Sequence, residues 1–169
     1  MIALYRPQIP PNTGNISRLC VGSNMPLAIV GKAAFSMDQK QVKRAGLDHW
    51  EDLQLKLFKR YADFYRAHSN TSRIICITKG ASSNLFDFSF QPEDILLFGN
   101  ETQGLPPKLL KHLPYSVRIP MSTKVRSLNL SNSVAIVLYE YLRQMDLQGK
   151  SFELREHIAE RTYYKKNEK

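Results

Sequence analysis

A run of small polar side chains stands at residues 127–133, with the sequence Ser-Leu-Asn-Leu-Ser-Asn-Ser, and leads directly into an apolar segment. One or two hydroxyl or amide groups are enough to cap a helix. The remaining groups exceed what packing at a helix start requires. The run therefore predicts the polar floor of a pocket at the mouth of a helix, and two cations, Lys124 and Arg126, lie in the loop before it.

A second polar pattern lies near the N-terminus, where Asn12, Asn15 and Arg18 recur every three residues. This spacing predicts one shared face at the start of a helix. Two amides and one guanidinium suit the recognition of an anion or a hydroxyl group, and a helix N-terminus favours anions. The same stripe can also be an ordinary solvated face, and spacing alone leaves both interpretations open.

A third candidate is the loop at residues 99–107, which reads Gly-Asn-Glu-Thr-Gln-Gly-Leu-Pro-Pro. It lacks the Gly-Lys-Ser/Thr ending of a P-loop, and Glu101 would repel a phosphate group. No Gly-x-Gly-x-x-Gly fingerprint and no Gly-x-Ser-x-Gly elbow occurs in the chain. These groups fit a neutral or cationic ligand of the adenosine type better than a triphosphate.

The elements that must position these groups alternate between strands and helices. Strands are predicted at residues 2–5, 27–30, 53–57, 73–78, 94–98 and 117–119. Helices are predicted at residues 14–24, 36–45, 61–67 and 129–145. A further short helix is predicted after the loop at residues 99–107 and ends at about residue 113. Asn12 or Thr13 is the expected N-cap of the first helix, and Trp50 is expected in a loop.

This alternation predicts an α/β fold with a mostly parallel sheet flanked by helices. Ligands of such sheets bind outside the carboxyl ends of the strands. The loops at residues 78–80, 99–107 and 120–127 follow predicted strands, so they are the expected binding loops.

Composition adds weaker constraints. The formal net charge of +9 permits a polyanionic partner without requiring one. No apolar run reaches the roughly 20 residues that span a membrane, and no signal peptide is recognisable, so the cytoplasm is the expected location. Cys20 and Cys76 are expected to be buried, reduced thiols, and the histidines show no metal-ligand spacing, so no metal is predicted.

The three motifs together resemble those of the SPOUT superfamily of RNA methyltransferases. More narrowly, the chain resembles the single-domain tRNA 2′-O-methyltransferases that modify the wobble cytidine or uridine of leucine tRNAs. The resemblance runs from residue 2 to about 149, which implies one SPOUT domain at residues 1–149. Residues 150–169 form a basic extension that either binds RNA or only adds solubility.

The resemblance implies a deep trefoil knot in the C-terminal part of the sheet, a homodimer whose active sites draw on both chains, and S-adenosyl-L-methionine as cofactor. The positions implied to bind this cofactor are Ile77, Thr78, Gly99, Glu101, Gly104, Ile119, Met121, Ser127 and Leu128. Arg18, Asn129 and Glu101 match the catalytic positions. Arg18 either takes the proton of the ribose hydroxyl, stabilises the forming alkoxide or binds a phosphate.

The implied substrate is the anticodon loop of tRNA. Its expected contacts are Asn12, Asn15, Lys124, Arg126 and Tyr139, and further basic residues expected at phosphates are Lys40, Lys43 and Arg44. For Tyr139, packing in the core is the alternative. For the chain as a whole, the alternatives are methylation of another RNA position and RNA binding without catalysis.

Overall fold

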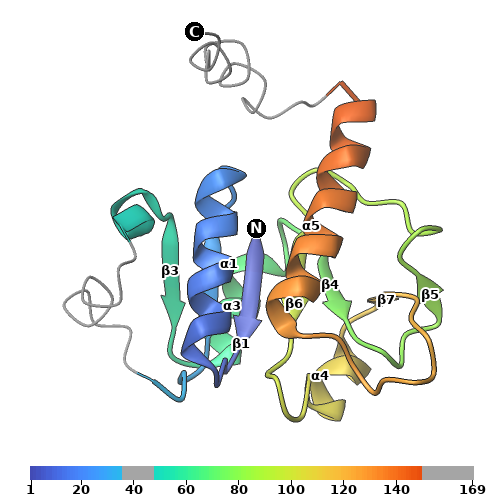
Figure 1. The fold of residues 1–169 in the computed structure, drawn as a ribbon, viewed down its shortest axis with the longest axis horizontal. Helices are drawn as coiled ribbons and strands as arrows, with labels where there is room; N and C mark the ends of the chain where they lie inside the picture. Colours follow the sequence, from blue (N-terminus) through green and yellow to red (C-terminus); the bar gives the residue numbers. More distant parts are fainter. Residues whose placement is uncertain (36–47, 150–169) are drawn as a thin grey trace, which may run out of the picture.

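A parallel sheet with the strand order β3-β2-β1-β6-β4-β7-β5 organises the computed structural model, which describes residues 1–35 and 48–149 (Figure 1). The strands are β1 (Ile2–Tyr5), β2 (Leu27–Val30), β3 (Leu55–Phe58), β4 (Ile74–Ile77), β5 (Ser83–Asn84), β6 (Ile95–Phe98) and β7 (Tyr115–Arg118). All pairs within this sheet are parallel, which confirms the predicted α/β fold.

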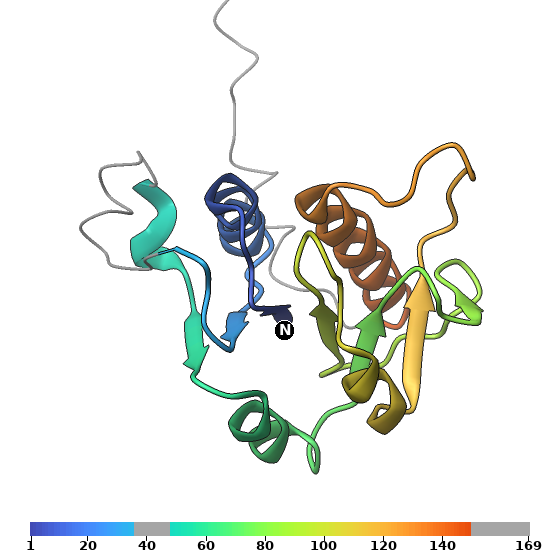
Figure 2. The ribbon, with the colours of Figure 1, turned by 90° about the horizontal axis from the view of Figure 1, so that it is seen from below.

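Helices cover both faces of the sheet (Figure 2). They are α1 (Pro10–Gly22), the 3-10 helix η1 (Asp48–Asp52), α3 (Tyr61–His68), α4 (Pro107–His112) and α5 (Leu130–Leu147). Strand β1 shows how the core divides. Its Ile2 and Leu4 pack in the cluster that includes α1 and α5, whereas Ala3 and Tyr5 pack with Phe64 of α3. Strands β1, β2, β4 and β6 are almost entirely apolar because both of their faces are buried.

The start of α1 differs from the prediction. The helix begins at Pro10, and its N-cap is Ile9, which makes no side-chain cap. Proline is tolerated in a first helical turn because the amide it lacks has no intrahelical partner there. Asn12 and Thr13 therefore lie inside the first turn, and the prediction that one of them caps the helix is wrong.

Smaller differences concern the edges of the sheet. Strand β3 starts later than predicted, β7 starts earlier, and the two-residue β5 was not predicted. Trp50 is buried in η1 rather than placed in a loop. The predicted helix at residues 36–45, the cations Lys40, Lys43 and Arg44, and the extension at residues 150–169 lie outside the described residues.

The segment between β4 and β6, residues 78–94, is held by elements that follow it in the chain. Arg118 at the end of β7 donates to the backbone carbonyls of Ala81 and Ser82. The side chain of Gln144 on α5 donates to the Phe88 carbonyl at 2.9 Å and accepts from the Phe90 amide at 2.8 Å. The segment therefore packs around both β7 and α5.

The two thiols, Cys20 and Cys76, are buried, and burial raises the pKa of each to about 12. They are therefore protonated near neutral pH, as expected for core residues. Over residues 1–35 and 48–149, no helix is both long and apolar enough to cross a membrane.

Candidate active site

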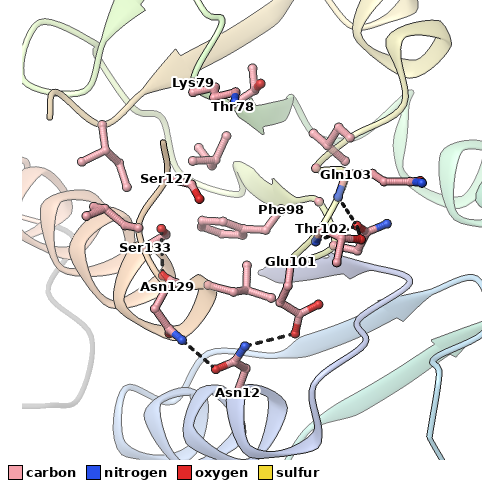
Figure 3. A pocket seen from close by; sticks show the side chains of 18 of the residues that line it. Asn12, Thr78, Lys79, Phe98, Glu101, Thr102, Gln103, Ser127, Asn129 and Ser133 are labelled. Atoms are coloured by element: carbon pink, nitrogen blue, oxygen red, sulfur yellow. Dashed lines mark hydrogen bonds between the residues drawn. The ribbon is translucent and has the colours of Figure 1, made fainter. Parts of the chain in front are cut away.

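A pocket of about 400 Å³ lies at the carboxyl edge of the sheet, where β4, β6 and β7 end (Figure 3). Its floor is the run that leads into α5, and its walls are the loops after β4, β6 and β7. The volume falls within the range of small-molecule sites. The lining residues are Ile9, Asn12, Ile77, Thr78, Lys79, Phe98, Gly99, Asn100, Glu101, Thr102, Gln103, Gly104, Leu105, Ile119, Met121, Ser127, Leu128, Asn129, Leu130 and Ser133.

Every residue predicted to bind the cofactor lines this one pocket, and so do Asn12 and Asn129. The convergence follows from the parallel sheet, because neighbouring parallel strands end at the same edge. Apolar surface from Ile77, Ile119 and Leu128 faces polar groups of the loop after β6. Among the lining residues only Lys79 and Glu101 are charged. An aromatic, mostly neutral ligand suits such a lining.

The loop after β6 closes on itself. Gly99 lies against the backbone of Gly104, so that a Cβ added at Gly99 would come within 2.0 Å of the Gly104 carbonyl carbon. Asn100 and Gly104 exchange backbone hydrogen bonds of 3.3 and 3.0 Å, and Gly104 has a φ of +69°, which favours glycine. Gly99 is therefore required for the closure of the loop itself.

Glu101 anchors this loop to the start of α1. Its carboxylate accepts hydrogen bonds from the backbone amides of Gln8 at 2.9 Å and Ile9 at 3.0 Å. The Asn12 side-chain amide donates to the same carboxylate at 3.1 Å. The positive end of the helix dipole favours a negative group at this place. Glu101 thus supplies the cap that no local side chain provides.

The chain of hydrogen bonds continues to α5 (Figure 3). The Asn129 amide group donates to the Asn12 side-chain oxygen at 3.0 Å. The Asn129 side-chain oxygen accepts from the backbone amide of Ser131 at 2.8 Å and from that of Asn132 at 3.4 Å, which caps α5. Glu101, Asn12 and Asn129 therefore join the starts of two helices to the loop after β6.

The other predicted site residues lie outside the pocket. Asn15 and Arg18 occupy exposed positions of α1, whereas Asn12 is only 5% exposed, so the prediction of one shared face is wrong. Tyr139 on α5 is 57% exposed, which contradicts the alternative of core packing. Lys124 and Arg126 are exposed in the loop that leads to the pocket floor.

Several lining residues were not predicted. Asn100, Thr102, Gln103 and Leu105 belong to the loop whose other members were selected, so their position in that loop was the available signal. Lys79 follows the predicted strand end in the same way. Leu130 and Ser133 belong to the run at residues 127–133 that was predicted as the pocket floor, and the remaining additions are Ile9 and Phe98. Sequence gave no reason to expect Ile9, because the early start of α1 brings it to the pocket.

Comparison with known proteins places this geometry in a family. The family model described as the SpoU rRNA methylase family matches residues 1–139. A protein of Aeromonas hydrophila named tRNA (cytidine(34)-2′-O)-methyltransferase is 42% identical over 150 residues, which cover 88% of this chain and 96% of the relative.

Solved structures agree with the sequence relatives. One, described as giving insight into the 2-OH methylation of C/U34 on tRNA, superposes with a TM-score of 0.80 and 36% identity, covering 88% of this chain and 95% of that one. The SpoU methyltransferase AviRb of Streptomyces viridochromogenes in complex with AdoMet superposes with a TM-score of 0.74 and 29% identity, covering 86% of this chain and 57% of that one. These matches confirm the resemblance seen in the three motifs, and the chain belongs to the SpoU methylase family.

Proposed function

We propose that this chain methylates the ribose 2′-hydroxyl of the wobble nucleotide of tRNA, using S-adenosylmethionine as methyl donor. The observation that carries the proposal is the pocket lined together by the loop after β6, by the run that leads into α5 and by Asn12 of the first motif. The relatives named for cytidine 34 match this chain over nearly their whole length, which supports the same target nucleotide here. Leucine tRNAs are the proposed substrates, and the cytoplasm is the proposed location.

The pocket residues divide into two proposed roles. Ile77, Ile119 and Leu128 supply the apolar surface on which adenine packs, and the loop after β6 offers backbone groups around it. Gly99, Glu101 and Gly104 keep this loop closed. Thr78, Met121 and Ser127 complete the proposed cofactor contacts. When bound, S-adenosylmethionine supplies an electrophilic methyl group, and the chain's task is to hold the ribose hydroxyl in line with it.

The closure of the loop gives a testable consequence. Gly99→Ala would place a methyl group 2.0 Å from backbone, so the loop must open. We expect the Kd for S-adenosylmethionine to rise at least about tenfold, which corresponds to about 1.4 kcal/mol. Isothermal titration calorimetry measures it. Gly22→Ala is the matched control, because nothing lies within 4 Å of the added Cβ there. Equal affinities in the two variants would contradict this account of the loop.

A second copy of the chain completes the proposed active site. Arg18 does not line the pocket of its own chain, yet it is the cation that matches the catalytic position. The exposed side of α1 and α5 carries Ile136, 39% exposed, and Tyr139, 57% exposed. We place the homodimer contact on this side, so that Arg18 of one copy reaches the pocket of the other. Asn15 is exposed on α1 and Tyr139 is exposed on α5, and both are proposed to contact the RNA beside the dimer contact.

Arg18 is proposed to act as a fixed cation. A guanidinium stays protonated in proteins, so it stabilises the negative charge that develops on the ribose oxygen as its proton leaves to solvent. Lys124 and Arg126 precede the pocket floor and are proposed to contact tRNA phosphates.

The proposed domain spans residues 1–149, and its C-terminal part is proposed to form the trefoil knot of this superfamily. Strand β4 lies between β6 and β7, although both follow it in the chain. Residues 78–94 pack around β7 and α5 through the contacts of Arg118 and Gln144. Such threading is rare among proteins, and the position of β4 together with these contacts supports the proposal.

Nucleoside analysis tests the proposed reaction directly. The purified chain is incubated with S-adenosylmethionine and unmodified leucine tRNA, and the digested RNA is examined by mass spectrometry. The expected result is a 2′-O-methylated nucleoside that maps to the wobble position. Methylation at another position, or RNA binding without any methylation, would overturn the proposal.

A further inference from the structure

A second hollow lies beside the cofactor pocket, on the other side of the loop after β6. Its lining residues are Arg6, Gln8, Lys32, Ala33, Ala34, Asn100 and Gln103, and its volume is about 580 Å³. Asn100 and Gln103 also line the cofactor pocket, so the two hollows share a wall. In Figure 3 the Gln103 side chain points away from Asn12 and Asn129.

The two charged residues of this hollow are both cations, Arg6 and Lys32. Within residues 1–35 and 48–149, neither of them forms an ion pair with a carboxylate. The carboxylate of Glu101 forms no ion pair with Arg6 or Lys32 among the described residues. Its two oxygens instead accept hydrogen bonds from Gln8, Ile9 and Asn12. The hollow therefore combines positive charge with no carboxylate in its lining.

The neutral side chains of the hollow are oriented as donors. The Asn100 side-chain oxygen accepts from the backbone amides of Gln103 at 2.7 Å and Thr102 at 3.2 Å. The Gln8 side-chain oxygen accepts from the Thr102 hydroxyl at 2.7 Å. The oxygens of Gln8 and Asn100 are thus engaged by residues of the loop after β6, which leaves the NH₂ groups of these two side chains as donors for a ligand. Cations and amide donors together select an anion.

The backbone of Arg6, whose side chain lines the hollow, adopts a strained conformation. Arg6 has a φ of 49°, in the left-handed region that few residues other than glycine adopt. Its side chain lies across Gly31, where an added Cβ would come within 2.9 Å of the Arg6 Cγ, and its guanidinium lies 5.3 Å from the centre of the Tyr5 ring. The neighbouring loop is tied down by a hydrogen bond from the Ala34 amide to the Pro7 carbonyl at 3.0 Å.

We infer that this hollow binds a phosphate of the RNA backbone next to the target nucleotide, and the inference rests on the proposed RNA substrate. In a ribonucleotide the 3′-phosphate is carried by the carbon adjacent to the one that bears the 2′-hydroxyl. A hydroxyl held at the cofactor pocket thus brings a phosphate close by, and the hollow with Arg6 and Lys32 shares Asn100 and Gln103 as a wall with that pocket. Arg6 and Lys32 are the contacts that would hold this phosphate and so position the RNA.

The test is the salt dependence of RNA binding. An anticodon stem-loop of leucine tRNA is titrated with the full chain at several salt concentrations. Each lost phosphate contact lowers the slope of log K against log[salt] by about 0.7 for single-stranded RNA. We expect the slope for R6A/K32A to be smaller in magnitude than the wild-type slope by about 1.4, which is two contacts. We also expect the affinity of this variant for the RNA to fall by about tenfold for each of the two lost contacts.

Three controls make the result specific. K56A removes one exposed cation from a hollow at the amino edge of the sheet and is expected to keep the wild-type slope. The charge-retaining variant R6K/K32R is expected to keep most of the slope. Unchanged affinity of R6A/K32A for S-adenosylmethionine shows that the variant is folded and that the cofactor pocket is intact.

The outcomes separate the inference from the proposed function. If wild-type chain methylates the RNA and R6A/K32A has the slope of K56A, the phosphate site is overturned while the proposed function stands. If wild-type chain neither binds S-adenosylmethionine nor methylates RNA, the proposed function itself fails. Binding of inorganic phosphate that depends on Arg6 and Lys32, without any change in the RNA slope, would also overturn the inference, because the site would then serve a free anion.

Discussion

Arg18→Ala is expected to lower kcat/KM for tRNA methylation by about 10²–10³-fold, the loss typical of removing a group that stabilises developing charge. The affinity for S-adenosylmethionine is expected to stay within about twofold of wild type, because Arg18 does not line the pocket of its own chain. Since Arg18 lies at an exposed position of α1, the fold should tolerate the change. Steady-state kinetics and calorimetry measure the two quantities.

A mixture of two impaired variants, assayed at a limiting concentration of S-adenosylmethionine, tests whether Arg18 acts across the dimer. Arg18→Ala keeps an intact pocket, and Gly99→Ala keeps an intact Arg18. If Arg18 serves the pocket of the second copy, mixed dimers contain one site with both wild-type residues, and activity returns on mixing. If Arg18 serves its own chain, every site in a mixed dimer has one defect, and activity does not return.

The matched control for Arg18 is Arg66→Ala, which removes an exposed arginine from α3 on the opposite face of the sheet. We expect it to leave methylation unchanged. Arg18→Lys keeps the charge but not the planar fork, so a partial recovery is expected. Full activity of Arg18→Ala would contradict the catalytic role, whichever chain supplies the residue.

The position of the pocket could be predicted from sequence because it depends on a general property of parallel sheets. Thr78, Gly99 and Ile119 each directly follow a strand, and the carboxyl ends of parallel strands meet at one edge. The order of the strands could not be predicted in this way. That β4 lies between β6 and β7 depends on contacts between segments far apart in the chain.

The role of Asn12 shows where local rules fail. An asparagine near a helix start is a common cap, but Pro10 begins α1 earlier, and the capping group is Glu101, which is distant in sequence. The stripe of Asn12, Asn15 and Arg18 fails for a geometric reason. With 3.6 residues per turn, each step of three falls about 60° short of a full turn. Arg18 is therefore turned well away from the buried Asn12.

The basic hollow had no local signature at all. Arg6 and Lys32 are separated by the whole of α1 and β2, and each is an ordinary cation in the sequence. They come together because β1 and β2 pair in parallel and end side by side. The left-handed backbone of Arg6 and the missing side chain of Gly31 then fix the direction of the guanidinium.

Glu101→Ala is expected to lower the free energy of unfolding by about 1–3 kcal/mol, because two backbone amides and the Asn12 amide lose their acceptor at the start of α1. The affinity for S-adenosylmethionine should also fall, since the carboxylate holds the loop after β6 against α1. Urea denaturation and calorimetry measure the two effects. Glu101→Gln keeps one acceptor oxygen but turns an NH₂ group toward a backbone amide, so an intermediate loss is expected.

Asp87→Ala is the matched control, because it removes an exposed carboxylate from residues 78–94 without touching α1. The comparison also decides between two roles for Glu101. A purely catalytic carboxylate would leave the stability and the cofactor affinity unchanged and lower only kcat. The hydrogen bonds to Gln8, Ile9 and Asn12 engage both carboxylate oxygens. They therefore favour the anchoring role of Glu101 over a purely catalytic one. A variant with wild-type stability and a large loss of kcat would contradict this anchor and return Glu101 to direct catalysis.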